Sequence, residues 1–149
     1  MIATSAPTVT EPRRERRIGR SIVAVLAGFL AIVVLDSGID AVVHATGIFP
    51  PFGQPMAGSL FLLALAYRTV DAIIGTYLVG RLAPHRPRRH AMALGLIGVV
   101  LSSLGVVATV YGGPELGPIW YPLALVAISL PCAWIGGTLA QGSRGQRID

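Results

Sequence analysis

Six polar side chains interrupt two otherwise apolar stretches of the chain, and they are the best candidates for chemistry. They are Asp36, Asp40, His44, Tyr67, Arg68 and Asp71. The first three are spaced i, i+4 and i+8, so they share one stripe if their segment is a helix. Arg68 and Asp71 are i, i+3 neighbours on the second segment. Because charges are costly in apolar surroundings, we expect the six side chains to face one another.

These residues allow three kinds of site. The leading interpretation is a structural ion pair between Arg68 and either Asp36 or Asp40, which would fix the register of two neighbouring helices. The second is a proton or cation pathway, in which a carboxylate binds and releases a cation. The third is a divalent metal site built from Asp40 and His44, which needs a further ligand from another helix. Three carboxylates face one arginine, so the ion pair alone leaves two carboxylates without a counter-charge.

Four apolar segments must position these residues, at about 22–45, 57–80, 91–111 and 119–140. Each is long enough to cross a hydrocarbon core, which takes about 20 helical residues. Apolar residues make up 53% of the 149-residue chain and charged residues only 13%. Only helices and closed barrels satisfy their backbone hydrogen bonds in lipid, and unbroken apolar runs favour helices. We therefore predict an all-α integral membrane protein, an antiparallel bundle of four transmembrane helices.

The arginines predict how this bundle is oriented. All twelve basic residues are arginine, and every one except Arg68 lies before the first segment, between residues 81 and 90, or after residue 141. The connectors at 47–55 and 112–118 contain none. The positive-inside rule therefore places both termini and the middle connector in the cytoplasm. At the opposite face we expect a belt of aromatic side chains, formed by Phe49, Phe52, Tyr111, Trp120 and Tyr121.

The segments also divide the chain into three parts. We expect residues 1–20 to be a disordered basic N-terminus, residues 21–141 a single transmembrane domain, and residues 142–149 a cytoplasmic tail. The basic start and the apolar run after it also resemble a signal peptide, but the three further apolar segments favour a retained first helix. The expected location is the bacterial inner membrane. The arginine clusters predict contact with anionic lipid headgroups rather than with nucleic acid.

Small residues at four-residue spacing predict close contacts between helices. They are Ala24 and Gly28, Ala72 with Thr76 and Gly80, Gly98 and Ser102, and Ala133 and Gly137. The same residues could also serve a homo-oligomer or a partner membrane protein. Pro131 lies inside the fourth segment and predicts a kink there.

Motifs for catalysis are missing from the sequence. The chain has no GxSxG, HExxH, P-loop or CxxC motif, and Cys132 is its one cysteine. We therefore expect no enzymatic activity and no cofactor. The sequence favours a non-enzymatic structural or interaction component of the membrane. The alternative is a small proton- or cation-coupled transporter or channel that uses the intramembrane carboxylates.

Four stretches of the sequence resemble a family of small uncharacterised four-helix bacterial membrane proteins with no assigned activity. They are HATGIFPPFGQPM (44–56), AYRTVDAIIGTYLVGRLAP (66–84), GPELGPIWYP (113–122) and LPCAWIGG (130–137). The likeness extends over about residues 20–140 and implies four transmembrane helices. The positions that match the family's pattern are Asp40, His44, Tyr67 and Arg68. Those that depart from it are Asp36 and Asp71, so a mechanism shared with the family should not depend on these two.

Overall fold

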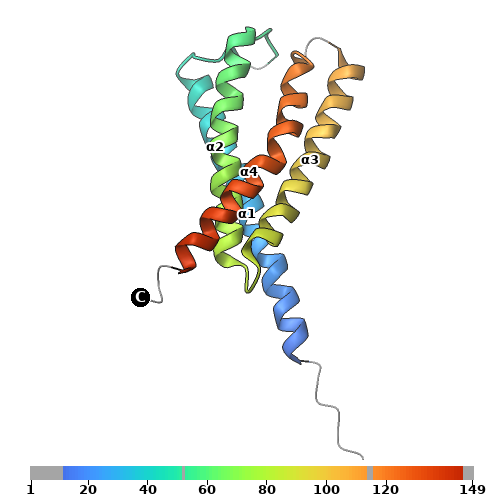
Figure 1. Ribbon diagram of the computed structural model, residues 1–149. Coiled ribbons are helices and arrows are strands. Elements are labelled where there is room, and N and C mark those ends of the chain that lie inside the picture. The colour runs from blue at the N-terminus through green and yellow to red at the C-terminus, as the bar shows by residue number, and fades with distance from the viewer. Residues whose placement is uncertain (1–11, 52, 114–115, 146–149) are drawn as a thin grey trace, which may run out of the picture.

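The structure is a computed structural model that describes residues 12–51, 53–113 and 116–145. Its four helices are α1 (Pro12–Ala45), α2 (Gly58–Leu82), α3 (Pro87–Gly112) and α4 (Trp120–Gly145). They run alternately in opposite directions, so α1 begins and α4 ends at the same end of the molecule (Figure 1). We call this the Arg-rich end, and the end with the two longer connectors the far end. The all-α prediction with four helices is confirmed for the described residues.

Every helix contains a stretch long and apolar enough to cross a membrane. The stretches are Ile18–Ala45, Gly58–Leu82, Pro87–Gly112 and Trp120–Ser143. The shortest has 24 residues, against about 20 needed to cross a bilayer core. Large aliphatic side chains cover much of the outer surface, and Val34, for example, is 68% exposed. A surface of this kind is unusual for a protein in water.

Two helices begin earlier than the sequence predicts. α1 starts at Pro12, so residues 12–20, expected to be disordered, are helical. Proline suits the first turn of a helix, and the arginine and glutamate residues that follow are good helix formers. α3 starts at Pro87 rather than near residue 91 for the same reason. Residues 1–11, most of the expected disordered segment, lie outside the described part of the chain.

The helices do not form a simple ring. α2 packs against all three other helices, whereas the backbones of α1 and α4 do not approach each other over the described residues. The antiparallel pairs α1–α2 and α3–α4 are extensive, as expected from their short connectors. The third large interface joins α2 to α4, which run in the same direction. Toward the far end, α1 and α2 diverge from α3 and α4 (Figure 1).

Close backbone contacts hold the half of the bundle near the Arg-rich end. A Cβ atom at Gly28 would lie only 2.6 Å from the carbonyl oxygen of Gly75, where α1 meets α2. A Cβ atom at Gly136 would lie 2.7 Å from the backbone nitrogen of Tyr77, where α4 meets α2. The Thr76 hydroxyl also lies 3.2 Å from the carbonyl oxygen of Cys132 across this interface. The prediction that small residues bring helices together is confirmed at Gly28 and Thr76.

The connector between α2 and α3 is the shortest in the molecule. Only residues 83–86 separate the two helices. Arg86 has a φ of 47° and is the one non-glycine residue in the described chain with a positive φ. Next to it, His90 Nε2 lies 2.9 Å from the Ser21 hydroxyl and connects α3 to α1. These contacts tie three helices together at the Arg-rich end.

At the far end, the connector after α1 folds back over the helices. The Phe49 amide donates a hydrogen bond of 2.9 Å to the Val43 carbonyl, and the Phe49 ring is only 3% exposed. Val43, Phe49 and Ala64 form a small buried cluster, against which Tyr121 packs. The prediction that Phe49 belongs to an outer aromatic belt is therefore wrong, whereas Tyr121 is only half-buried and its place in the belt stays a prediction. Tyr111 is 86% exposed and fits that belt, and Phe52 lies outside the described residues.

Candidate functional site

The polar residues of α1 and α2 meet between the two helices, just below the Phe49 cluster. Tyr67 donates a hydrogen bond through its hydroxyl to Oδ1 of Asp40. Arg68 Nη2 donates to the other oxygen, Oδ2, over 2.8 Å. Tyr67 and Arg68 are consecutive on α2, and together they provide a donor for each oxygen of one carboxylate. We call Asp40, Tyr67 and Arg68 the polar lock.

This geometry shows which of the two candidate carboxylates, Asp36 or Asp40, pairs with Arg68. Its closest acceptor is Asp40, whereas Nη1 lies 3.9 Å from Oδ2 of Asp36. From the rise per residue alone, Asp36 is the carboxylate at the height of Arg68. The long arginine side chain instead extends toward the far end, where its guanidinium reaches Asp40, one helical turn beyond Asp36.

Asp36 and Asp71 form the second part of the site. Their carboxyl groups interact with each other across the α1–α2 interface. Asp71 is only 2% exposed. Asp36 Oδ1, Asp71 Oδ2 and Arg68 Nε have no hydrogen-bond partner within the described residues. Buried polar atoms are normally paired, so these three atoms are exceptions that call for an explanation.

His44 does not join this cluster. Its Nδ1 lies 2.7 Å from the Asp40 backbone carbonyl, one turn earlier on α1, and its ring packs edge-to-face on Phe49 at 5.4 Å. Both oxygens of the Asp40 carboxylate already accept hydrogen bonds from α2. Among the described residues, no group of three or more His, Cys, Asp or Glu side chains is placed to hold a metal ion. A metal site built from Asp40 and His44 therefore lacks a third ligand among the described residues.

A cavity of about 540 Å³ lies beside the cluster, where α1 and α4 do not meet. All four helices contribute to its walls, which are largely apolar, with Phe29, Leu101 and Leu125 as examples. Of the residues that the structure describes, Asp36 and Arg68 are the only charged ones that line it. The volume falls within the range of about 300–1,000 Å³ typical of small-molecule sites.

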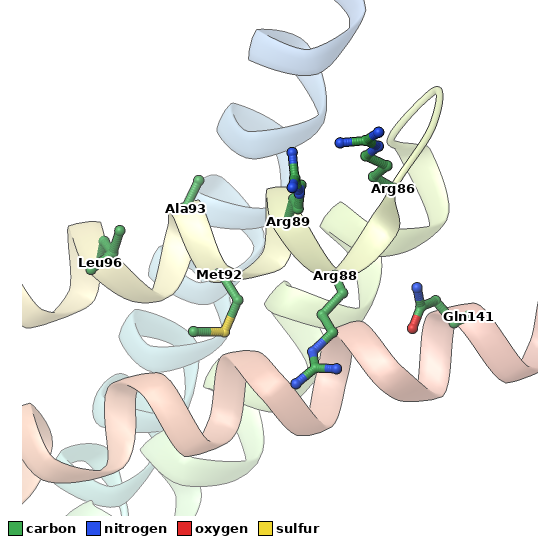
Figure 2. A pocket seen from close by; sticks show the side chains of 7 residues that line it. All are labelled: Arg86, Arg88, Arg89, Met92, Ala93, Leu96 and Gln141. Atoms are coloured by element: carbon green, nitrogen blue, oxygen red, sulfur yellow. The ribbon is translucent and has the colours of Figure 1, made fainter.

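A smaller cavity of about 460 Å³ lies at the Arg-rich end, on the surface of α3. Figure 2 shows Arg88 reaching over α4, while Arg86 and Arg89 extend from the other side of α3. The guanidinium of Arg88 lies 5.2 Å from the centre of the Trp134 ring. Met92, Ala93 and Leu96 continue the same surface along α3 as an apolar strip (Figure 2). We call this surface the arginine pocket.

Sequence reasoning missed two contributors to these sites. Tyr121 lines the large cavity and is close enough to Arg68 to interact with its charge. Phe49 covers the polar lock from the far end. Both were assigned to the aromatic belt because they flank apolar segments. The proline-rich connector after Gly47 was the signal available for Phe49, since it indicates a folded loop rather than a lipid-exposed one.

Comparison with known proteins adds no further assignment. No protein-family model, curated protein or solved structure matches this chain. What the protein does must therefore be argued from its own residues.

Proposed function

We propose that the chain is a multi-pass protein of the bacterial inner membrane, with four spans and both ends in the cytoplasm. Two observations support the proposal. Exposed aliphatic side chains lie along all four helices. Arg20, Arg81 and the arginines of the arginine pocket lie at one end of the bundle, as the positive-inside rule requires of a cytoplasmic face.

Topology reporters test this orientation. An enzyme that is active only outside the cytoplasm should be active when inserted within residues 47–55. The same reporter should be inactive at residue 84 or fused after residue 149. Activity at residue 84 would reverse the orientation, and a cytoplasmic reporter at 47–55 would contradict the four-span topology.

Within the membrane, the protein is a non-enzymatic structural or interaction component whose first two helices are joined by the polar lock. The observation that carries this proposal is that both oxygens of Asp40 accept hydrogen bonds from α2. Arg68 is partly accessible, with 30% of its side chain exposed. In surroundings of low polarity a hydrogen-bonded ion pair holds its geometry firmly, and removing one partner leaves an uncompensated charge.

A charge-rescue experiment tests the polar lock. Arg68→Ala should lower the yield of monodisperse protein after detergent extraction, because it leaves the carboxylates without a counter-charge. Adding Asp36→Asn and Asp40→Asn should restore much of that yield. Arg20→Ala, at an exposed position near the start of the first span, is the matched control and should behave like the native chain. Equal yields for Arg68→Ala and Arg20→Ala would remove the basis for the lock.

A second candidate function is a proton or cation pathway. The unpartnered oxygens of Asp36 and Asp71 favour it, because the polar lock does not use them. Proteoliposomes should then show proton or cation flux that Asp71→Asn abolishes while the protein stays folded. Flux no greater than that of empty liposomes, for protons and for several cations, would exclude this candidate.

The proposed lipid partner is an anionic phospholipid at the arginine pocket. Arg88 on one side of α3 and Arg86 with Arg89 on the other flank an apolar strip, so a phosphate headgroup can bind on either side with its acyl chain along the strip. Native mass spectrometry of the detergent-solubilised protein should show bound phosphatidylglycerol in preference to phosphatidylcholine. Arg88→Gln with Arg89→Gln should abolish that preference. Inorganic phosphate added in excess should not displace the lipid, because it lacks the acyl chain.

A further inference from the structure

We infer that the large cavity between α1, α3 and α4 is a binding site for a lipophilic organic cation. The inference goes beyond the proposed structural role and does not depend on the orientation of the protein in the membrane. It is built from two observations: the size and apolar lining of the cavity, and the surplus of carboxyl groups at one place on its wall.

The cavity has the size and lining of a site for an apolar ligand. Its volume is about 540 Å³. Most of its wall is aliphatic or aromatic, and two of the hydroxyl groups on it are engaged within their own helices. Thr109 bonds the Gly105 carbonyl over 2.9 Å, and Ser129 bonds the Leu125 carbonyl over 2.6 Å. A ligand that enters therefore meets apolar surface, with charge at one place only.

That charge is predominantly negative. Three carboxyl groups (Asp36, Asp40 and Asp71) meet one guanidinium, that of Arg68. Arg68 is paired with Asp40 at 2.8 Å, so its charge is already balanced. Asp36 and Asp71 hydrogen-bond to each other and so share a proton, which leaves this pair with one negative charge, and Asp36 is its member on the cavity wall. An anionic ligand would add to the imbalance, whereas a cation would reduce it.

The exposed part of Asp36 marks where the cationic centre would lie, since this side chain is 20% exposed and lies on the cavity wall. Tyr121 lines the cavity near this point and offers an aromatic ring to a cation. The apolar body of the ligand would extend along α3 and α4 toward Leu125 and Ile128. The ligand class is thus an organic cation whose apolar groups surround or adjoin the charge.

Two matched probes test the inference. Tetraphenylphosphonium and tetraphenylborate have nearly the same shape and opposite charge, so their comparison isolates the effect of charge. Equilibrium binding is measured on full-length protein in detergent, with empty micelles subtracted. The native chain should bind the phosphonium at least about tenfold more tightly than the borate, as one favourable charge contact implies. Asp36→Asn should remove that preference.

Filling the cavity provides an independent readout. Gly105 lies on the wall, and a Cβ atom there would only touch Pro122 at 3.6 Å, so Gly105→Leu should fold and weaken phosphonium binding by about tenfold or more. Gly38→Leu is the matched control, because nothing lies within 4 Å of a Cβ atom at Gly38, and its binding should equal that of the native chain.

Three results would overturn the inference. They are equal binding of the two probes by the native chain, no binding above empty micelles, and binding that Gly105→Leu leaves unchanged. If Asp36→Asn does not fold, the Gly105→Leu and Gly38→Leu pair still decides the question. Failure here would leave the polar lock untouched, because the charge-rescue experiment measures folded protein without any ligand.

Discussion

The two halves of the bundle are held together by different means. Near the Arg-rich end, backbones touch: Gly28 lies against Gly75 and Gly136 against Thr76, with no room for a side chain at either glycine. Toward the far end, the helices separate and are joined by side chains, through the polar lock and the Phe49 cluster. The large cavity lies in this second half.

The difference shows how a membrane bundle can combine stability with an internal site. Lipid offers no hydrophobic drive for helices to associate, so close packing and polar contacts must provide it. Close packing needs many neighbouring small residues and leaves no space for an internal cavity. A polar contact joins two helices at one point, so space can remain beside it. The charges of Asp36 and Arg68 border the cavity because they occupy the half that is not closely packed.

Two tryptophans allow the halves to be followed separately. Trp134 lies beside Arg88 at the Arg-rich end, and Trp120 packs near Phe61 at the far end, with ring centres 6.4 Å apart. They are the two tryptophans of the chain. Replacing either one by phenylalanine leaves the emission of the other as a reporter of its own half.

The largest effect is expected from Gly136→Ala. The added Cβ atom would lie 2.7 Å from both the Ile73 carbonyl oxygen and the Tyr77 nitrogen, and these backbone atoms inside α2 cannot move aside. We expect a loss of about 3 kcal/mol in the free energy of unfolding, or no folded protein. Thermal unfolding followed through Trp134 emission measures it. Gly142→Ala is the control, since nothing lies within 4 Å there, and it should be neutral or slightly stabilising.

A smaller effect is expected from Phe49→Ala. The ring is buried against Val43 and Ala64, so its removal leaves a void above the polar lock. We expect a loss of about 2 kcal/mol, less than for a core phenylalanine in water because lipid is itself apolar. Trp120 emission should change more than Trp134 emission. Its exposed neighbour provides the control, and Ile48→Ala should change neither signal. Equal shifts at both tryptophans would show that the halves are not independent.

The smallest effect is expected from Tyr67→Phe. This change removes the donor to Oδ1 of Asp40 and keeps the ring and the Arg68 contact. We expect a loss of about 1 kcal/mol, the usual net value of one hydrogen bond. Thermal unfolding through Trp120 emission measures it, with Tyr111→Phe at an exposed position as the control. A loss no greater than that of Tyr111→Phe would mean that Arg68 alone carries the lock.

Much of this architecture could be predicted from the sequence, because it depends on local patterns. Long apolar runs determine the four helices, and the i, i+4 spacing places Asp36 and Asp40 on one stripe. An arginine in an apolar segment needs a carboxylate nearby, which predicts a contact of Arg68 with Asp36 or Asp40 but not which of the two. The helix ends at the Arg-rich side were less predictable. Apolar runs mark where a membrane would begin, whereas a helix continues as long as its backbone allows.

The remaining features depend on contacts between distant segments. The parallel packing of α2 on α4 arises from Thr76 and Gly136, which are 60 positions apart and have no common sequence pattern. The cavity lies where the backbones of α1 and α4 stay apart, and no residue type signals that separation. Phe49 and Tyr121 flank apolar segments, as belt residues do. The inward packing of Phe49 follows from the fold of a loop, and Tyr121 packs against the same cluster from the first turn of α4.

The four-residue connector that ends at Arg86 determines how this molecule can deform. Its left-handed turn joins α2 directly to α3, and the His90–Ser21 contact adds α1 to the same junction. These three helices are therefore joined at the Arg-rich end, whereas the connectors at the far end are longer. Any transient separation of these helices is therefore largest at the far end of the bundle. A ligand leaving the large cavity beside Asp36 would exit laterally, between the separating helices, while the Arg-rich end stays closed.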